Sequence, residues 1–325
     1  MTRAVGFVAI GRNEGARLLA CLDSLAASGG GPVVYVDSGS SDGSVEAARA
    51  RGADVVALDM TRPFTAARAR NEGLRRLCEI APGLEFVQFI DGDCALAPDW
   101  IAKAAAFLGA RPDVAVVCGR RRERFPEASL YNRLCDLEWA TPVGEARACG
   151  GDALMRIAAL VEAGGYRDSL IAGEEPELCV RLRARGHRIW RLDAEMTLHD
   201  AAMTRFGQWW RRSERAGHAF AEVSALHAHS PHGIWAQETR RALLWAGAAP
   251  AAIVLALAVS PAFLTVLLLY PAQVARLYRR HRGEGADALP RAALTVFAKF
   301  AEAKGALSYY LGRLGAGRRG LIEYK

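Results

Sequence analysis

The segment Phe86-Val87-Gln88-Phe89-Ile90-Asp91-Gly92-Asp93 is an apolar run that ends in two acids one residue apart. Such a run is typical of a strand buried on both faces, and the acids would then lie at the edge of the sheet. Carboxylate oxygens presented together suit Mg²⁺ or Mn²⁺, and such ions keep open positions for substrate phosphates. Asp-Gly-Asp after a strand is also ordinary turn chemistry. The segment alone leaves both interpretations open.

The first half of the chain alternates short β-like runs with helical segments rich in Ala, Leu and Arg. The expected strands are 5–10, 33–36, 54–58 and 86–90, and the expected helices are 16–27, 44–51, 64–77 and 100–108. This order predicts an α/β fold with a mostly parallel, Rossmann-like sheet and helices on both faces. Further on, a strand at 114–118, a helix at 177–185 and a strand-like segment at 189–192 continue a more mixed pattern.

A polar cluster follows each of three expected strands. The clusters are Arg12-Asn13-Glu14, Asp37-Ser38-Gly39-Ser40 and Asp91-Gly92-Asp93. Ligands of parallel sheets bind at the carboxyl ends of the strands. We therefore expect the three clusters to converge on one crevice.

The charge and the cysteines restrict the partners and the compartment. The formal net charge is +7, and arginines cluster at 120–122, 211–212, 240–241 and 276–282. No nucleic-acid-binding motif accompanies them, and the last two clusters flank the longest apolar run, so membrane phospholipid is expected as a partner and nucleic acid is not. The seven cysteines are scattered without a C-x-x-C pair, which predicts reduced thiols. The chain begins with a strand-like run rather than a signal-peptide pattern, so we expect its front part in the cytosol.

Residues 243–270 carry no charge. A straight helix of this length would span roughly 42 Å, against about 30 Å of bilayer hydrocarbon. Because Ser260-Pro261 divides the run and arginines stand at both ends, we expect an apolar hairpin or re-entrant pair over 243–275. A single long tilted span and a buried helical subdomain are the alternatives. Residues 291–314 have the composition of an amphipathic helix, either at the membrane interface or packed on the catalytic domain.

Five motifs in order resemble those of the family 2 glycosyltransferases. They are Val8-Ala9-Ile10-Gly11-Arg12-Asn13-Glu14, the segment Val34 to Ser44, Ala67-Arg68-Ala69-Arg70-Asn71, Phe89-Ile90-Asp91-Gly92-Asp93, and the segment Gly173 to Leu182. The resemblance covers roughly residues 5–199. It implies a GT-A fold and a nucleotide-diphospho-sugar donor, here with UDP favoured. We expect this GT-A domain over 1–225, followed by a membrane-associated helical region over 226–325.

The resemblance also implies donor-site roles. Asn13 and Glu14 match the first nucleotide-contacting turn, and Asp37, with Ser38 and Gly39, matches the acid that reads the base. Arg68, Arg70 and Asn71 match the helix near the diphosphate or ribose, although either arginine could equally lie on a solvated helix face. The acids around Gly92 match the metal-binding pair, in which Asp93 holds Mg²⁺ or Mn²⁺ on the diphosphate and Asp91 reaches the ribose or a metal-bound water. His199 could complete the metal site or be structural.

Acceptor-side roles follow from the same resemblance. Glu174-Glu175-Pro176-Glu177 occupies the place of the family's E-D motif, whose acid deprotonates the acceptor hydroxyl. Glu175 is the expected base and Glu174 stays open, while simple charge decoration of a helix start is the alternative. Gly150, Gly151 and Asp152 resemble the acceptor-side turn. Trp209 and Trp210 could stack on an acceptor sugar or belong to an interfacial helix.

The function implied by the resemblance is an inverting, metal-dependent glycosyltransferase of the hexosyltransferase type. It would move one sugar to an acceptor hydroxyl. The apolar segment suggests that the acceptor is a lipid-linked glycan in surface polysaccharide synthesis and that the catalytic domain lies on the cytosolic face of the inner membrane. Two alternatives stay open. One is a polyprenyl-phosphate sugar synthase, which needs no base. The other is a non-catalytic nucleotide-sugar-binding scaffold.

Overall fold

The computed structural model describes residues 5–315 and divides them into two compact units. Unit 1 comprises the residues up to Pro126 together with Cys135–Ala202, and unit 2 comprises Glu127–Leu134 and the residues from Met203 onward. The helix after residue 203 therefore falls in unit 2, whereas the sequence predicted a first domain that ends at residue 225.

Unit 1 is an α/β sandwich. Its strands are β1 Val5–Gly11, β2 Val33–Asp37, β3 Asp54–Ala57, β4 Phe86–Asp91, β5 Cys94–Leu96, β6 Val114–Glu123, β7 Gly144–Ala146, β8 Ala153–Arg156 and β9 Arg188–His199. Its helices are α1 Ala16–Ala27, α2 Ser44–Ala50, α3 Ala66–Ile80, α4 Trp100–Ala110, α6 Ile157–Glu162 and α7 Glu174–Ala184, and α5 Leu130–Glu138 straddles the two units.

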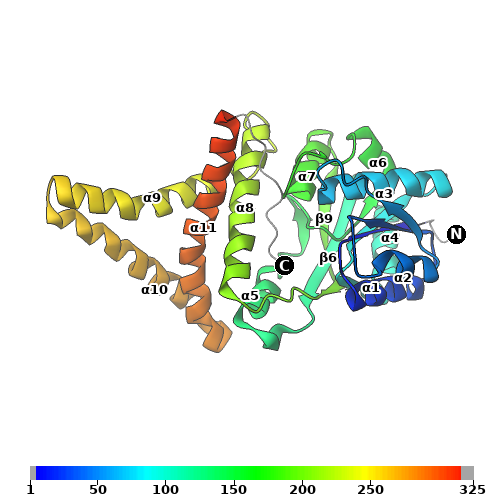
Figure 1. Cartoon of the computed structure of the whole chain (residues 1–325), viewed down its shortest axis with the longest axis horizontal. Coiled ribbons are helices and arrows are strands. Elements are labelled where there is room, and N and C mark those ends of the chain that lie inside the picture. Colours follow the sequence, from blue (N-terminus) through cyan, green and yellow to red (C-terminus); the bar gives the residue numbers. More distant parts are fainter. Residues whose placement is uncertain (1–4, 316–325) are drawn as a thin grey trace. The chain divides into compact units, whose positions relative to one another are not determined.

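The strands form one sheet in the order β3-β2-β1-β4-β8-β6-β9-β5, with β7 beside β9. Strands β1 to β4 are parallel to one another, β8 runs antiparallel to both β4 and β6, and β9 is parallel to β6. Six of the nine strands in the described residues thus run in one direction, which confirms the mostly parallel sheet. In Figure 1, α1 and α2 lie on one side of these strands and α3 lies on the other.

Apolar side chains explain why the central strands are buried. Phe86, Val87, Phe89 and Ile90 of β4 are fully buried, so this strand has an apolar core on both of its faces. β4 pairs with β1 so that Asp91 lies opposite Ile10, and β1 pairs with β2 so that Asp37 lies opposite Gly11. The carboxyl ends of these three strands therefore meet at one edge, as the sequence predicted.

Unit 2 is helical. It contains η1 Pro126–Ala128 at the border of the units, α8 Phe206–Leu226, α9 Ala236–Ala258, η2 Pro261–Leu268, α10 Leu269–His281, η3 Arg282–Asp287 and α11 Ala288–Leu314. We call α9, η2 and α10 the apolar arm. Its two helices meet at their far ends through η2 (Figure 1), which is the hairpin that Ser260-Pro261 predicted.

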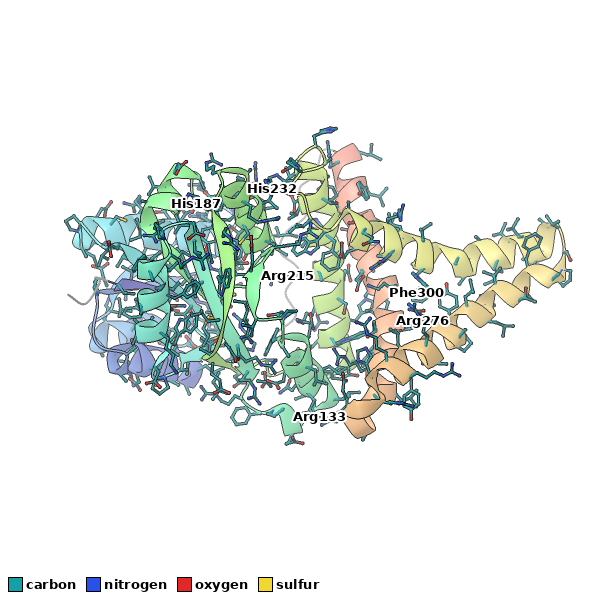
Figure 2. The ribbon with its side chains drawn as sticks, turned by 180° about the vertical axis from the view of Figure 1, so that it is seen from behind. Arg133, His187, Arg215, His232, Arg276 and Phe300 are labelled. Atoms are coloured by element: carbon teal, nitrogen blue, oxygen red, sulfur yellow. The ribbon has the colours of Figure 1, made fainter. Side chains whose placement is uncertain are left out.

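Helices α8 and α11 cross with almost no space between their backbones. A Cβ added to Gly217 would lie 1.9 Å from the Glu302 carbonyl oxygen, and one added to Gly305 would lie 1.9 Å from the Glu214 carbonyl oxygen. Arg133 binds Asp287 at 3.0 Å at the start of α11, and Tyr270 stacks on Phe300 at 5.7 Å, which joins α10 to α11. Arg133 and Phe300 are labelled in Figure 2, together with Arg276 on α10.

Candidate active site at the carboxyl edge of the sheet

The turns after β1 and β2 are bound to each other. The Asn13 amide donates to Ser40 Oγ at 2.9 Å, and the Ser41 amide donates to Asn13 Oδ1 at 2.8 Å. Asn13 has a φ of 55°, the left-handed conformation that Asn adopts more readily than most residues. The Ser38 amide donates to the Gly11 carbonyl at 3.0 Å. The two predicted nucleotide-contacting turns are therefore joined by hydrogen bonds into one surface.

Asp37 is buried within its own turn. Its Oδ2 accepts from the amides of Gly39 and Ser40 at 2.9 and 2.8 Å, and its Oδ1 accepts from the Tyr35 hydroxyl at 3.1 Å. Gly39 has a φ of 83°, which the turn requires. The carboxylate thus holds the turn, and its predicted contact with a base stays a prediction. Asp42 holds the neighbouring turns, because it accepts from the Ser44 amide at the start of α2 and from the Gly15 amide.

Glu14 and Gly92 bring the first turn against the Asp91-Gly92-Asp93 turn. Glu14 pairs with Arg17 at 2.8 Å. A Cβ on Gly92 would lie 3.1 Å from the Ile10 carbonyl oxygen and 3.3 Å from Glu14 Cγ. Glycine at this position therefore permits the close approach of the two turns.

Arg70 joins the donor-side and acceptor-side acids. Its guanidinium, only 2% exposed, lies 2.8 Å from Asp91 Oδ1, 3.0 Å from Glu174 Oε1 and 2.8 Å from Glu175 Oε1. Arg70 is buried, so the interpretation of this side chain as part of a solvated helix face is wrong. Three motifs far apart in the sequence meet at this one side chain.

Arg121 was not expected at the site. Its guanidinium lies 2.7 Å from Asp152 Oδ2 and 3.4 Å from Asp91 Oδ2. Asp152 is fully buried, and it also accepts from the Asp91 amide at 3.0 Å and from the Thr197 hydroxyl at 2.7 Å. We call Asp91, Asp152, Glu174 and Glu175 the arginine-held acids, because each of them contacts Arg70 or Arg121.

The predicted acceptor turn lies directly against this cluster. A Cβ on Gly151 would lie 2.7 Å from Arg70 Nη2 and 2.8 Å from Asp91 Oδ2, so a larger residue would displace these side chains. Gly150 is exposed, and a Cβ at that position would meet nothing within 4 Å. Of the two glycines, Gly151 is the one that the packing of the site requires.

Helix α7 begins at Glu174, three residues earlier than predicted, and its first turn carries the two candidate bases. Burial raises the pKa of Glu175 to about 8; Arg70 opposes this shift, whereas Glu174 and Asp91 add to it. One guanidinium between three carboxylates leaves an excess of negative charge, so retention of a proton on the buried acid follows from the geometry. A raised pKa is typical of a general base that works near neutral pH.

Arg68 and Asn71 do not join the arginine-held acids. Arg68 is buried and donates to the carbonyls of Asp59, Arg62 and Pro63, so it is not a solvated face either. Asn71 binds the backbone of Tyr166 through both its amide nitrogen and its oxygen. Both residues hold neighbouring loops, and a donor contact for either of them stays a prediction.

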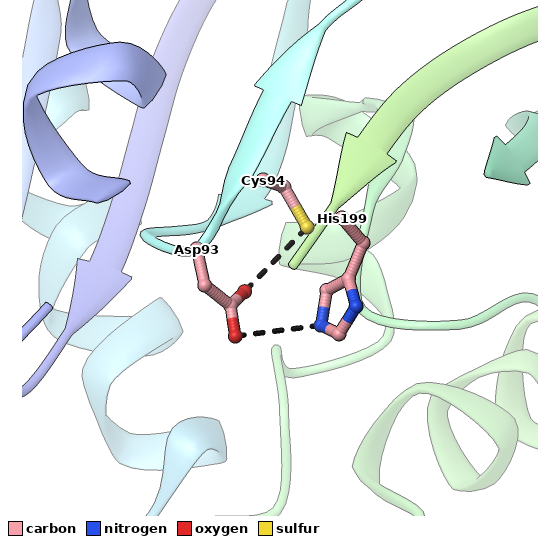
Figure 3. Close-up of side chains that lie close together, drawn as sticks. All are labelled: Asp93, Cys94 and His199. Carbon is pink, nitrogen blue, oxygen red and sulfur yellow. Dashed lines mark hydrogen bonds and ion pairs between the residues drawn. The ribbon is translucent and has the colours of Figure 1, made fainter. Parts of the chain in front are cut away.

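Asp93 faces His199 rather than the arginines of the cluster. His199 Nε2 lies 3.4 Å from Asp93 Oδ2, and both residues are buried, together with Cys94 (Figure 3). One ligand atom from each of these three residues lies within 4.8 Å of the others, as metal ligands would. Asp91 lies in a second such group, with Cys94 and Asp152.

The donor chemistry of the first group fits a divalent ion. A carboxylate oxygen suits both Mg²⁺ and Mn²⁺. Of these two ions, an imidazole nitrogen favours Mn²⁺, because Mn²⁺ is a transition metal. Cys94 is a poor ligand for either ion, because a thiol is a soft ligand and both ions prefer oxygen ligands. Asp93 and His199 are therefore the two side chains best suited to hold the ion.

Trp209 and Trp210 belong to α8 in unit 2. Trp209 is buried and stacks on Tyr131 and Phe297, with ring centroids 6.3 and 6.5 Å apart, and Trp210 also packs on Phe297. Their contacts are those of a helical core, and stacking on a sugar stays a prediction.

Comparison with known proteins agrees with the fold and with the family resemblance of the first half of the chain. Residues 8–155 match the family model described as Glycosyl transferase family 2. The succinoglycan biosynthesis protein ExoA of Rhizobium meliloti (strain 1021) is 29% identical over 173 residues, which are 50% of this chain and 51% of that protein. The chain thus aligns with about half the length of this curated relative.

Two solved structures have similar folds. The mannosyltransferase PcManGT from Pyrobaculum calidifontis, in complex with GDP-Man and Mn²⁺, gives a TM-score of 0.65 at 22% identity, covering 94% of this chain and 88% of that one. Residues 1–349 of S. aureus TarS give a TM-score of 0.53 at 16% identity, covering 95% and 92% of the two chains. These structures share a fold with this chain, and the GT-A-type architecture is confirmed.

Proposed function

The chain carries a family 2 glycosyltransferase domain, and from this premise we propose that it transfers one sugar from a nucleotide-diphospho-sugar to a hydroxyl group, with inversion at the anomeric carbon. The observation that supports this most directly is the meeting of Asp91, Glu174 and Glu175 on Arg70, beside the pair formed by Asp93 and His199. The donor-side acid Asp91 and the acceptor-side acids Glu174 and Glu175 thus contact the same guanidinium.

Glu175 is the proposed general base. Its carboxylate takes the proton of the acceptor hydroxyl as the oxygen attacks the anomeric carbon, and the bond to the nucleoside diphosphate breaks on the opposite face. Burial keeps the base away from bulk water, and Arg70 fixes its position at 2.8 Å. Glu174, which contacts the same guanidinium at 3.0 Å, stays the second candidate.

Asp93 and His199 are the proposed ligands of the divalent ion. A bound Mg²⁺ or Mn²⁺ supplies charge neutralisation for the departing diphosphate. The two side chains offer one hard oxygen and one imidazole nitrogen from opposite sides of the same small space (Figure 3). The turns of Asn13 and Asp37 are proposed to hold the nucleoside, with UDP as the expected nucleotide.

Membrane association is proposed for the apolar arm. α9 has a mean hydropathy of 1.7 over its most apolar window, and 11% of that window is buried. Among the residues that the structure describes, α9 is the one helix that is long and apolar enough to cross a membrane. Leu257 and Leu268 are 85% and 65% exposed. Arginines stand at both ends of the arm, at 240–241 and at 276–282. An apolar surface with a cationic base suits a bilayer with anionic headgroups.

The acceptor is proposed to be a lipid-linked glycan of a surface polysaccharide, used at the cytosolic face of the inner membrane. Two observations support this proposal: the exposed apolar arm, and the likeness of half the chain to a protein named for succinoglycan biosynthesis. A hexose is the expected sugar.

The test uses the purified full chain in detergent or lipid, a panel of UDP- and GDP-sugars, and Mn²⁺. Transfer to a lipid-linked saccharide with an inverted anomeric product is the expected result. Transfer to polyprenyl phosphate that survives both Glu174→Gln and Glu175→Gln would show a polyprenyl-phosphate sugar synthase instead. Donor binding without any transfer or hydrolysis would show a scaffold.

A further inference from the structure

Glu123 lies directly beside His199 at the ends of two neighbouring strands. β6 and β9 are parallel, and their register pairs Glu123 with His199. The Arg124 amide donates to the His199 carbonyl at 2.7 Å, which closes this end of the strand pair. Both side chains are buried, at 3% and 5% exposure. Neither the sequence motifs nor the proposed function assigns a role to Glu123.

The Glu123 carboxylate is itself held by backbone groups. Its Oε1 accepts from the Phe125 amide at 3.1 Å, and its Oε2 accepts from the Ala201 amide at 3.1 Å. Two amide donors hold this buried carboxylate in place. A fixed acceptor is what orients a neighbouring ring.

The imidazole of His199 stands between two carboxylates. Its Nε2 faces Asp93 Oδ2 at 3.4 Å, and its Nδ1 faces Glu123 Oε2 at 3.7 Å. Trp139 packs edge-on against the ring, with centroids 4.9 Å apart and an interplanar angle of 84°. Nδ1 is buried and makes no hydrogen bond within residues 5–315, and Glu123 Oε2 is the carboxylate oxygen that faces it, 3.7 Å away.

We propose that Glu123 is a positioning residue that accepts the Nδ1 proton of His199 and so leaves the Nε2 lone pair directed at the ion held by Asp93. Metal-binding histidines are commonly oriented in this way, by a carboxylate on the nitrogen away from the metal. The inference rests on the proposed function, because it takes the ion to bind between Asp93 and His199. It adds the residue that selects the tautomer.

The first measurement is Mn²⁺ binding to the full chain by calorimetry, without any sugar donor. Glu123→Gln keeps the size of the side chain and removes its charge, and we expect it to weaken Mn²⁺ binding by about 10- to 100-fold. The matched control is Glu195→Gln, the same change at an exposed position of β9. Unchanged Mn²⁺ affinity in folded Glu123→Gln would overturn the proposal.

The second measurement is ¹⁵N NMR of the histidine rings, which needs neither metal nor activity. The unsubstituted chain should show His199 as the Nδ1-protonated tautomer, identified by the loss of its signal in His199→Asn. A wild-type ring protonated on Nε2 would overturn the inference even if Glu123→Gln failed to fold. Asp93→Asn tests the premise separately: if that variant bound Mn²⁺ normally, the proposed metal site would fail whatever tautomer His199 adopts.

Discussion

Asp91 and Asp93 are separated by one residue, yet their carboxylates face different kinds of side chain. Asp91 lies between Arg70 and Arg121, at 2.8 and 3.4 Å, whereas Asp93 faces the imidazole of His199 at 3.4 Å. A guanidinium is permanently charged and can only donate hydrogen bonds, while a neutral imidazole offers a lone pair. The first environment suits acids that must be held in place, and the second suits an acid that shares an ion.

The largest expected effect comes from changing one of the arginine-held acids. Glu175→Gln removes the proposed base without changing its size, and kcat for transfer to a hydroxyl acceptor should fall by about 10²- to 10⁴-fold. Glu174→Gln is the matched control, because it alters another contact of Arg70. A large loss in Glu174→Gln with near-normal Glu175→Gln would exchange the roles of the two residues.

In the pair formed by Asp93 and His199, Asp93→Asn should lower kcat by about 10²- to 10³-fold, since the charge on the leaving diphosphate would no longer be neutralised. The thermal melting temperature should stay close to that of the parent chain. Asp99→Asn, at an exposed position beside Lys103, is the control. Normal turnover of Asp93→Asn with added Mn²⁺ would show that Asp93 does not hold the ion, and the proposed difference between Asp91 and Asp93 would be wrong.

The pH dependence of kcat, measured with saturating Mn²⁺, should report on Glu175 among the arginine-held acids. Because burial raises the pKa of Glu175 to about 8, the base is mostly protonated at pH 7, and kcat should rise about tenfold per pH unit up to that value and then level off. The sign for stability is opposite. The folded chain keeps a proton that the unfolded chain loses near its ordinary pKa of 4.5, so the free energy of unfolding should fall between pH 4.5 and 8. Glu175→Gln should flatten both profiles, and unchanged profiles would contradict the assignment.

The smallest expected effect concerns packing. Gly151→Ala would place a methyl group 2.7 Å from Arg70 Nη2, and overpacking of this kind costs about 1–3 kcal/mol of unfolding free energy. Gly150→Ala meets nothing within 4 Å and should be neutral. Mn²⁺ affinity should change little in either variant. Denaturant unfolding and Mn²⁺ titration of the two glycine variants would show whether the arginine-held acids can be disturbed without changing Mn²⁺ binding by Asp93 and His199.

Much of the fold could be predicted from local patterns. The helix at 16–27 was predicted with the bounds that α1 has, and the strands up to β4 were placed to within one residue at each end. The convergence of Asp37 and Asp91 followed from the rule that parallel strands end at one edge. These features depend on apolar runs and turns that are visible in short windows of sequence.

The predictions fell short where distant segments pair. β6 was expected to end at residue 118, but it continues to Glu123 because β9, also longer than expected, runs beside it. Arg121 and Glu123 lie on that extension, so their contacts with Asp152 and His199 were not foreseen. Polar residues with no apolar alternation give no local signal for a strand. The partners of Arg70, Arg68 and Asn71 likewise depend on which loop each side chain reaches.

The crossing of Gly217 and Gly305 also fixes how α8 and α11 can be aligned along their lengths. A shift of one helix by a single residue moves it about 1.5 Å and turns a different side chain toward the partner backbone. The neighbours of the two glycines are Ala216 and His218 on α8 and Lys304 and Ala306 on α11. None of them fits where an added Cβ would already lie 1.9 Å from a carbonyl oxygen. The pair therefore acts as a stop against sliding, and changes in helix length are tolerable only beyond the crossing.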